Sequence, residues 1–225
     1  PGGRGPPVPG GPGFPSGRPR ARWPPGCGGP RRWTRWSGRA MVRLLLVRHF
    51  PTAENHAGRF LGRRDLPALV PDGVAPLDLG RPPVVFTSPL ARARTTAAAL
   101  FPDVPARVDA RLIERSFGAW EGCTRGQVAA LQPDAVGEGG VLDLNRTPRG
   151  GESVEALCAR VGAFLAEVAA SEGSPAVAVA HAGVILAALA LVRAPGAPVD
   201  WRRSVPYATP LTLEVPAGWR PPGAR

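Results

Sequence analysis

Leu44-Leu45-Leu46-Val47-Arg48-His49 is the stretch of sequence that decides the fold. Four consecutive branched apolar residues are typical of a strand that is buried on both faces, and such strands belong to parallel sheets. The run breaks off into Arg48 and His49, so a cation and an ionisable ring stand at the carboxyl end of the predicted strand. In an open α/β sheet, ligands bind at this end of the strands.

A second stretch has the same form. Ala176-Val177-Ala178-Val179-Ala180-His181 is a small apolar run that ends in histidine and continues into Ala182-Gly183. The chain contains only three histidines, and two of them follow predicted strands. Because the carboxyl ends of parallel strands meet at one edge of a sheet, we expect His49 and His181 to act together.

Apolar patterning predicts strands that alternate with helices after Met41. Strands are expected at 42–47, 84–87, 104–108, 176–180 and 209–215, and helices at 52–57, 90–100, 124–131, 152–170 and 182–192. Thr52 and Ser88 are predicted to cap the first two helices, and Glu152 to lie in the first turn of the longest one. This alternation predicts an α/β fold, a three-layer α/β/α sandwich around a mostly parallel sheet. The connection 132–151 is long enough to be a lid or functional loop.

The net charge of +11 is unevenly distributed along the 225 residues. Residues 1–40 hold eight of the 28 arginines and no acidic residue, which leaves 20 arginines against 17 acidic residues, or +3, for 41–225. No basic residue is a lysine, which is typical of GC-rich coding rather than of binding to a phosphate backbone. The near balance of the body of the chain argues against a nucleic-acid partner.

One α/β domain, expected over residues 41–215, accounts for most of this length. Residues 1–40 are rich in Pro, Gly, Arg and Trp, and we expect them to be disordered because they offer little aliphatic surface to bury. The only methionine is Met41, so we hypothesise that it is the natural start; a basic targeting arm is the competing interpretation. Residues 216–225 are expected to form a frayed tail.

Cysteine usage indicates a reducing compartment. Cys27, Cys123 and Cys158 lie far apart, in an odd number and without CxxC spacing, which favours a cytoplasmic protein with no disulfide framework and no zinc site. No apolar run reaches the roughly eighteen residues of a membrane span, and the start lacks the apolar segment of a secretory signal. We expect no metal and no cofactor, and the sequence does not determine the oligomeric state.

Five short motifs follow one another between residues 48 and 183. They are Arg48-His49-Phe50-Pro51-Thr52-Ala53-Glu54-Asn55, Thr87-Ser88-Pro89-Leu90-Ala91-Arg92-Ala93, Glu114-Arg115-Ser116-Phe117-Gly118-Ala119-Trp120-Glu121-Gly122, Gly151-Glu152-Ser153 and Ala180-His181-Ala182-Gly183. In this order they resemble the histidine phosphatase superfamily, also called phosphoglycerate mutase-like, branch 1. Each motif alone is weak, whereas five in order are specific. The form around Glu114 resembles the α-ribazole phosphatase and broad phosphomonoesterase members.

The resemblance implies metal-independent hydrolysis of a small phosphomonoester through a phosphohistidine intermediate. Such hydrolysis needs a nucleophile, an acid for the leaving group and positive charge for the phosphoryl oxygens. Imidazole has an unperturbed pKa of about 6.5, so its neutral form is available as a nucleophile near pH 7. By the family pattern His49 attacks phosphorus, Glu114 is the general acid and His181 completes the catalytic set.

The resemblance also assigns the binding side chains. The phosphate-binding residues would be Arg48, Asn55, Arg92 and His181, and the candidate substrate contacts are Thr52 and Phe50. Trp120 and Glu121 are expected to fix the loop behind Glu114 rather than to contact substrate. His56 matches no catalytic position of the family, so a surface role is expected for it.

Three positions depart from the family pattern. Phe50 and Pro51 replace the usual Gly and Glu, and Leu61 stands where many relatives have Gln. The Phe50 ring must either pack inward or narrow the mouth of the site, and its backbone must avoid a conformation that only glycine adopts readily.

Two alternatives to a phosphatase remain open at this point. A mutase-type phosphotransferase would carry a longer Glu-Arg-His-Tyr-Gly-x-Leu-x-Gly-Leu-Asn stretch at the position of Glu114, which the chain lacks. A phosphate-binding regulatory protein without turnover would be expected to have lost His49 or Glu114, and both are present. The sequence therefore favours the phosphatase.

Overall fold

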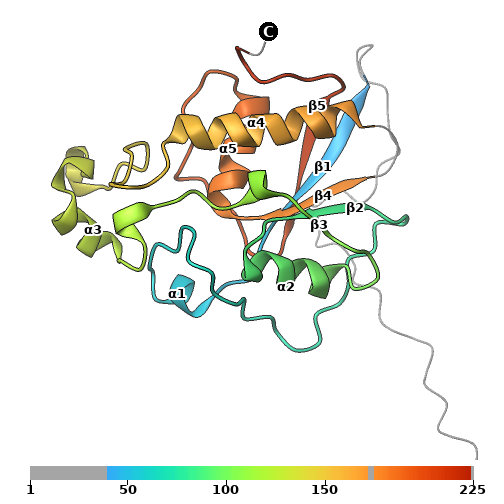
Figure 1. The fold of residues 1–225 in the computed structure, drawn as a ribbon, viewed down its shortest axis with the longest axis horizontal. Coiled ribbons are helices and arrows are strands. Elements are labelled where there is room, and N and C mark those ends of the chain that lie inside the picture. Colours follow the sequence, from blue (N-terminus) through green and yellow to red (C-terminus); the bar gives the residue numbers. More distant parts are fainter. Residues whose placement is uncertain (1–39, 172–174, 224–225) are drawn as a thin grey trace, which may run out of the picture.

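A five-stranded sheet forms the centre of the structure, a computed structural model that describes residues 40–171 and 175–223 (Figure 1). Its strands are β1 (Met41–Arg48), β2 (Val84–Thr87), β3 (Arg107–Val108), β4 (Ala176–Ala180) and β5 (Pro210–Pro216). They lie in the order β3-β2-β4-β1-β5, all parallel except β5, which pairs with β1 in the antiparallel direction. The mostly parallel sheet predicted from the sequence is confirmed, whereas residues 1–39 of the expected disordered extension lie outside the described residues.

Helices alternate with these strands as the patterning predicts. They are α1 (Ala53–His56), α2 (Ala91–Leu100), α3 (Arg125–Leu131), α4 (Val154–Ala170) and α5 (Ala182–Arg193), with short 3-10 turns η1 (Ala110–Leu112), η2 (Gly118–Trp120), η3 (Pro133–Ala135) and η4 (Glu138–Gly140). Helix α3 and the turns that follow it lie beyond the carboxyl ends of β1 and β4 (Figure 1). None of the helices in the described part of the chain has the length and apolar character needed to cross a membrane.

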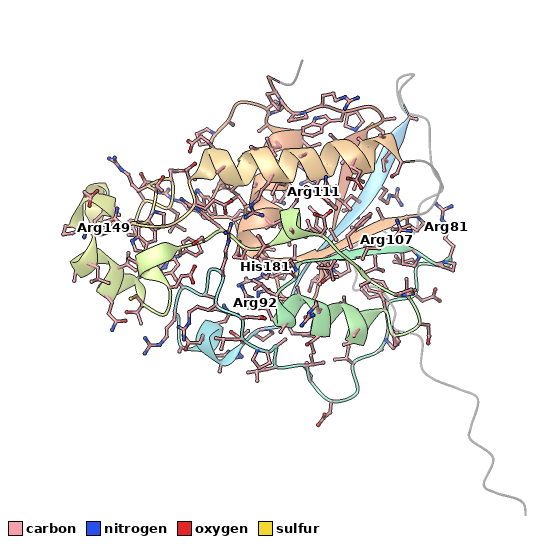
Figure 2. The ribbon with its side chains drawn as sticks, in the orientation of Figure 1. Arg81, Arg92, Arg107, Arg111, Arg149 and His181 are labelled. Carbon is pink, nitrogen blue, oxygen red and sulfur yellow. The ribbon has the colours of Figure 1, made fainter. Side chains whose placement is uncertain are left out.

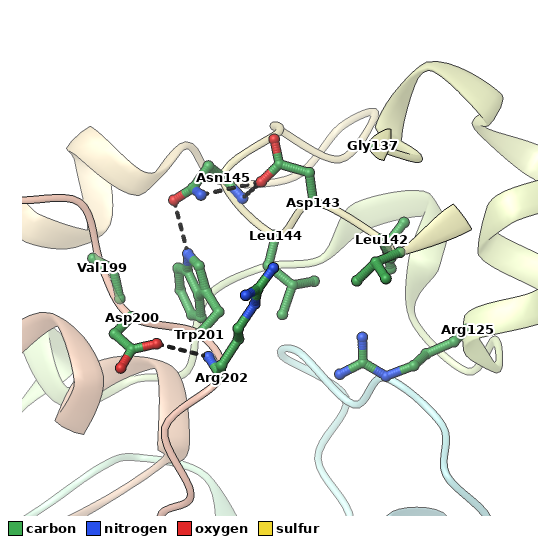
Figure 3. A pocket seen from close by; sticks show the side chains of 11 residues that line it. Arg125, Gly137, Leu142, Asp143, Leu144, Asn145, Val199, Asp200, Trp201 and Arg202 are labelled. Carbon is green, nitrogen blue, oxygen red and sulfur yellow. Dashed lines mark hydrogen bonds between the residues drawn. The ribbon is translucent and has the colours of Figure 1, made fainter. Parts of the chain in front are cut away.

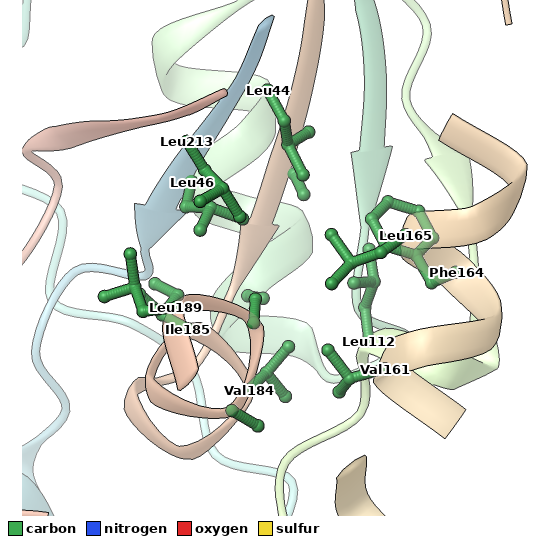
Figure 4. Close-up of a cluster of buried hydrophobic side chains, with 14 of the residues drawn as sticks. Leu44, Leu46, Leu112, Val161, Phe164, Leu165, Val184, Ile185, Leu189 and Leu213 are labelled. Atoms are coloured by element: carbon green, nitrogen blue, oxygen red, sulfur yellow. The ribbon is translucent and has the colours of Figure 1, made fainter. Parts of the chain in front are cut away.

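The two faces of β1 bury alternate side chains in two different clusters. Leu44 and Leu46 pack with side chains of α4 and α5, a cluster drawn in Figure 4. Leu45 and Val47 pack on the opposite face with side chains of α2 and of the loop 68–79. Successive side chains of a strand point to opposite faces, so a strand that is apolar throughout needs a cover on both. The expected three layers are therefore present.

Two predicted helix starts are wrong. Helix α2 begins at Ala91 with Leu90 as its N-cap, and the N–H of Ala91 donates to Asp65 Oδ1 at 2.6 Å. The Ser88 hydroxyl is instead within 2.8 Å of His181 Nε2, since the end of β2 places it against the end of β4. Glu152 precedes α4, which is capped by Ser153. Its carboxylate pairs with Arg160 at 2.7 Å, so an ion pair rather than the helix dipole holds it.

The segment after β5 is packed as far as Trp219, contrary to the expected frayed tail. The Trp219 side chain packs against the cluster formed with α4 and α5. The N–H of Ala217 donates to the carbonyl of Ala40 at 2.8 Å, and the N–H of Gly218 donates to that of Ala169 at 3.0 Å. These bonds hold the end of the chain along α4 and the start of β1.

Truncating Leu46 tests whether burial of β1 stabilises the sheet. Leu46 is 1% exposed, and deleting a leucine side chain from a packed core costs about 2–5 kcal/mol because a cavity remains. We expect Leu46→Ala to lower the free energy of unfolding in urea by that amount. Leu69→Ala is the matched control, since Leu69 is 50% exposed and its loss should change stability by less than about 1 kcal/mol. Equal effects of the two changes would contradict this account.

Candidate active site

The pairing register of the sheet brings the two strand-end histidines together. Arg48 lies opposite Ala180 in the β1–β4 pair, and the backbone N–H of His49 donates to the Ala180 carbonyl at 3.0 Å. Each histidine therefore directly follows the last paired residue of its strand, His49 after Arg48 and His181 after Ala180. Their ring centroids are 5.0 Å apart. The expectation that these histidines meet at one edge of the sheet is confirmed.

His49 presents a neutral ring with one free nitrogen. The ring nitrogen Nδ1 lies 2.5 Å from the Phe50 carbonyl oxygen, which only accepts hydrogen bonds, so we assign the proton to Nδ1 and the lone pair to Nε2. Burial, with smaller effects from the charges of Arg92 and Arg48, lowers the pKa of His49 to about 3. An imidazole with that pKa is unprotonated at neutral pH and can act as a nucleophile.

Phe50 holds His49 through its backbone, and its ring faces the core. The ring packs in the cluster that covers the α2 face of the sheet, so it packs inward rather than narrowing the mouth of the site. Its backbone φ is negative, as the replacement of glycine requires, and its N–H donates to Thr96 Oγ1 at 2.9 Å. The inward packing does not support the prediction that the Phe50 side chain contacts substrate.

His181 stands at the end of β4 beside the start of α2, where Arg92 lies (Figure 2). The ring is fully buried, and burial is the main cause that lowers the pKa of His181 well below its usual value, with Arg92 next. Its Nε2 is 2.8 Å from Ser88 Oγ. With the serine hydroxyl donating to Nε2, the proton of the neutral ring is on Nδ1, which faces no protein acceptor among the described residues.

Arg48 is held by a residue that the sequence analysis missed. Its Nη2 donates to the Tyr207 hydroxyl at 2.7 Å, and its Nη1 donates to the Val205 carbonyl at 2.9 Å. The guanidinium carbon is also 3.7 Å from the centroid of the Tyr207 ring. Ala208, the next residue, has φ of +47°, and its N–H donates to the Arg48 carbonyl at 2.8 Å. This bond holds Tyr207 beside β1 and maintains the strained backbone of Ala208.

Arg92 is fully buried in the first turn of α2 and is bonded to the loop between α1 and β2. Its Nη1 donates to the Arg64 carbonyl at 2.6 Å and its Nη2 to the Gly62 carbonyl at 2.8 Å. A guanidinium has five N–H groups, so these two bonds leave three donors for a ligand. Burial lowers the pKa of Arg92, with Glu114 opposing that effect, yet arginine remains charged in proteins.

Asn55 and Thr52 form a reciprocal cap at the start of α1, as predicted for Thr52. The Thr52 hydroxyl accepts from the Asn55 N–H at 3.2 Å, and Asn55 Oδ1 accepts from the Thr52 N–H at 3.1 Å. The cap uses the amide oxygen of Asn55 and fixes the orientation of its NH₂ group. A donor role for Asn55 thus agrees with the geometry, whereas Thr52, 1% exposed, is committed to the cap. His56 is exposed at the end of α1.

Glu114 is buried and bonded to two backbone N–H groups. Its Oε1 accepts from Arg115 N at 2.9 Å, and its Oε2 accepts from Gly183 N, in the first turn of α5, at 3.4 Å. Burial raises the pKa of Glu114, against the lowering effects of the Arg115 N–H and of the Arg92 charge. A carboxyl with a raised pKa keeps its proton at higher pH than an exposed glutamate, as a general acid requires.

The Arg115 side chain holds the segment 144–152 in place beside Glu114. Its side chain is fully buried and donates to the backbone carbonyls of Leu144, Arg146 and Glu152, at 2.5, 3.0 and 2.8 Å. One side chain thus fixes two carbonyls of the connection 132–151 and the carbonyl of Glu152 directly after it. The sequence offered no signal for this role, because the partners are backbone oxygens about 30 residues away.

Trp120 and Glu121 support the loop behind Glu114, as expected. Glu121 Oε1 accepts from the N–H groups of Arg63 and Phe117, each at 3.0 Å. Trp120 is fully buried, and its Nε1 donates to Gln132 Oε1 at 2.9 Å.

Three buried nitrogens near His49 have no hydrogen-bond partner among the described residues. They are Arg48 Nε, Arg92 Nε and His181 Nδ1. An unsatisfied buried donor costs about 1–3 kcal/mol, and such groups are rare. Donors of this kind around a neutral ring suit an anion rich in acceptor oxygens, such as a phosphoryl group. The described part of the chain contains no group of three or more His, Cys, Asp or Glu side chains arranged for a metal ion.

Comparisons with known proteins agree with this chemistry. The sequence profile described as "Histidine phosphatase superfamily (branch 1)" matches residues 44–215. The glucosyl-3-phosphoglycerate phosphatase of Mycobacterium tuberculosis is 34% identical over 171 residues, which cover 68% of this chain and 76% of that protein.

Two solved mycobacterial structures share the fold. The structure of mycobacterial hydrolase 1 matches with a TM-score of 0.62 at 29% identity. The match covers 77% of this chain and 92% of the hydrolase chain. A mycobacterial glucosyl-3-phosphoglycerate phosphatase in complex with VO3 has a TM-score of 0.56 at 31% identity, over 70% of this chain and 84% of its own.

Replacing Gly183 by alanine tests whether activity depends on the position of the Glu114 carboxyl. A Cβ there would lie 2.6 Å from Glu114 Oε1, so the carboxyl has to move. A displacement of about 1 Å at a catalytic group can cost about 10²-fold in rate. We expect Gly183→Ala to lower kcat/KM for glycerol phosphate by about that factor.

Gly126→Ala in α3 is the matched control, because nothing lies within 4 Å of a Cβ at that position. Its kcat/KM should equal that of the unaltered protein. Full activity of Gly183→Ala would show that the carboxyl position is unimportant.

Proposed function

Because the chain belongs to the histidine phosphatase superfamily, branch 1, we propose that this phosphatase works through a phosphohistidine formed on His49. The observation that carries the proposal is the free Nε2 of a neutral, buried His49, set beside three unsatisfied nitrogens of Arg48, Arg92 and His181. A free imidazole nitrogen surrounded by unsatisfied donors is what attack on a phosphoryl group requires, and this supports the proposal.

In the first step the lone pair of His49 Nε2 forms a bond to phosphorus while the ester P–O bond breaks. The leaving oxygen takes the electron pair of that bond and the proton of Glu114. The Nδ1–H bond to the Phe50 carbonyl stabilises the positive charge that develops on the imidazole. Glu114 is left as a carboxylate, which the N–H groups of Arg115 and Gly183 stabilise.

In the second step water attacks the phosphohistidine and the P–N bond breaks. The Glu114 carboxylate takes the proton of the attacking water, so the general acid of the first step becomes the base of the second. Inorganic phosphate and the original neutral His49 are the products. The two steps restore every protonation state.

Four side chains are proposed to hold the phosphoryl oxygens during both steps. Arg48 and Arg92 supply the N–H groups that Val205, Tyr207, Gly62 and Arg64 leave free, and His181 donates from Nδ1. Asn55 donates from its amide nitrogen. Charge-assisted bonds of this kind are the strong ones, and they are most favourable for the charge that the transition state spreads over the oxygens.

The substrate is proposed to be a small phosphorylated metabolite. The relatives named glucosyl-3-phosphoglycerate phosphatase act on a phosphate ester of a small organic acid, which makes that class of compound the first to test. A cytoplasmic location is part of the proposal, supported by the free thiols of Cys123 and Cys158.

Replacing the nucleophile tests the proposed intermediate. We expect p-nitrophenyl phosphate to be hydrolysed in EDTA, and His49→Ala to lower kcat by at least about a thousandfold because the covalent step is lost. Rapid quenching with a labelled ester should trap acid-labile phosphate on His49. His56→Ala is the matched control, since His56 is exposed outside the site.

Two results would overturn the phosphohistidine. One is turnover by His49→Ala at the level of the unaltered enzyme. The other is phosphate that binds reversibly, without a covalent bond to the protein and without hydrolysis of any ester. That result would identify a phosphate-binding protein.

The pH dependence tests Glu114 as the proton donor. Protonated Glu114 is the active form, so kcat/KM for an alkyl phosphate falls as pH rises through the raised pKa of Glu114. His49 stays neutral down to its pKa of about 3, so it sets no limit near neutrality. We expect a mildly acidic to neutral optimum, and a maximum well above about pH 9 would contradict the assignment.

The Glu114→Gln variant separates the ionisation of Glu114 from the ionisation of the ester. The ester ionises in the same way with the variant and with the unaltered enzyme. The variant should lose about 10²–10⁴-fold in kcat/KM on an alkyl phosphate, and the ratio to the unaltered enzyme should shrink with rising pH. The loss should be smaller on p-nitrophenyl phosphate, whose leaving group needs no proton. Glu155→Gln, at an exposed position of α4, is the control.

A further inference from the structure

Tyr207, the only tyrosine of the chain, lies beside the residues to which phosphoryl transfer is assigned above. Its ring centroid is 6.0 Å from that of His49. Its hydroxyl oxygen is 2.7 Å from Arg48 Nη2, and the guanidinium carbon of Arg48 lies 3.7 Å from the centre of the ring. The phenol therefore borders both the proposed nucleophile and a proposed phosphoryl-binding side chain.

The segment that carries Tyr207 is anchored on both sides. Before Tyr207, Trp201 Nε1 donates to Asn145 Oδ1 at 2.9 Å, a bond drawn in Figure 3. After it, the N–H of Ala208 donates to the Arg48 carbonyl at 2.8 Å. The φ of +47° at Ala208 is a strained conformation, which persists only where the surrounding structure enforces it. The phenol is thus held in one place, as a preorganised hydrogen-bonding group must be.

The Tyr207 hydroxyl has one hydrogen that the described part of the protein does not use. A guanidinium donates and never accepts, so the phenol oxygen is the acceptor of the bond from Arg48. A phenol also carries one O–H donor, and no described residue accepts a hydrogen bond from it. Accepting a bond from a cation polarises the phenol and strengthens that O–H as a donor.

This free O–H adds to the unsatisfied donors around His49. The others are Arg48 Nε, Arg92 Nε and His181 Nδ1. A phosphoryl group presents three oxygens, each able to accept hydrogen bonds. Because Arg48 Nη2 and the Tyr207 oxygen are only 2.7 Å apart, neighbouring oxygens on one phosphorus can accept from both groups at once.

We propose that Tyr207 is a further phosphoryl-binding residue, whose O–H donates to a phosphoryl oxygen during transfer. The proposal rests on the function proposed above and adds a fifth side chain to the four assigned there. A phenol contributes a donor without a charge, so it strengthens binding of the anion without placing a further cation beside His49. A fixed donor of this kind favours the transition state, in which negative charge spreads over the oxygens.

The Tyr207→Phe variant removes the hydroxyl and keeps the ring that lies against Arg48. We expect the Kd of inorganic phosphate to rise by about tenfold or more, the usual worth of a hydrogen bond to a charged group. The kcat/KM for p-nitrophenyl phosphate should fall by a similar factor. Ser204→Ala is the matched control, because it removes an exposed hydroxyl from the same segment, and it should leave both quantities unchanged.

Fluorination separates donation to phosphate from the positioning of Arg48, since Tyr207→Phe removes both. The chain has one tyrosine, so expression with 3-fluorotyrosine alters Tyr207 alone. Ring fluorine makes a phenol a stronger donor and a weaker acceptor. At about pH 6 the Kd of phosphate should therefore fall in the fluorinated enzyme. An equal or higher Kd would show that the hydroxyl only positions Arg48, and the proposed donation would be wrong.

The unaltered enzyme distinguishes an error in the role of Tyr207 from an error in the proposed function. If it neither hydrolyses p-nitrophenyl phosphate nor binds phosphate, the proposed function is wrong and the role of Tyr207 fails with it. If it does both, and Tyr207→Phe matches it in kcat/KM and in phosphate affinity, the phosphatase stands and the role of Tyr207 is refuted.

Discussion

The site depends on burying two guanidinium groups without neutralising them. Removing a charge from water costs several kcal/mol unless polar partners replace the solvent. Arg48 and Arg92 find such partners in the carbonyls of Val205, Gly62 and Arg64 and in the hydroxyl of Tyr207. These acceptors are uncharged, so they hold the guanidiniums in place but leave their positive charge available. A dianion that enters the site therefore meets charge that is already oriented, and little reorganisation is needed when negative charge moves in the transition state.

The same arrangement shifts the pKa values of the proposed nucleophile and of the proposed acid in opposite directions. Burial and the neighbouring cations disfavour a charged ring, and both effects lower the pKa of His49. For Glu114 they compete, since Arg92 favours the carboxylate while burial favours the acid, and burial prevails so that its pKa is raised. Exclusion of water therefore keeps the proposed nucleophile unprotonated and favours the protonated form of the proposed acid within one site. Gly183, whose N–H donates to Glu114, leaves no room for a side chain beside the carboxyl, since a Cβ there would lie 2.6 Å from Glu114 Oε1.

The sequence predicted those parts of the structure that depend on neighbours along the chain. Apolar runs located β1 and β4. The proximity of His49 and His181 could then be predicted, because the pairing of parallel strands brings their carboxyl ends together. Capping by Thr52 was likewise local. The roles of Ser88, Arg115 and Tyr207 were not predictable in this way, since each contacts residues from about 30 to 160 positions distant. The positive φ of Ala208 had no signal either, because alanine has no preference for that conformation.

The candidate site draws its residues from two kinds of structure. Arg48, His49 and His181 stand at strand ends, so the pairing of β1 with β4 fixes their positions. Arg92 and Asn55 come from α2 and α1, and Glu114 comes from the segment between η1 and η2. Arg115 helps to fix that segment, because its side chain bonds the Leu144 carbonyl and its backbone N–H bonds the Glu114 carboxyl. The position of the proposed acid therefore depends on contacts outside the sheet, whereas the position of the proposed nucleophile depends on the sheet itself.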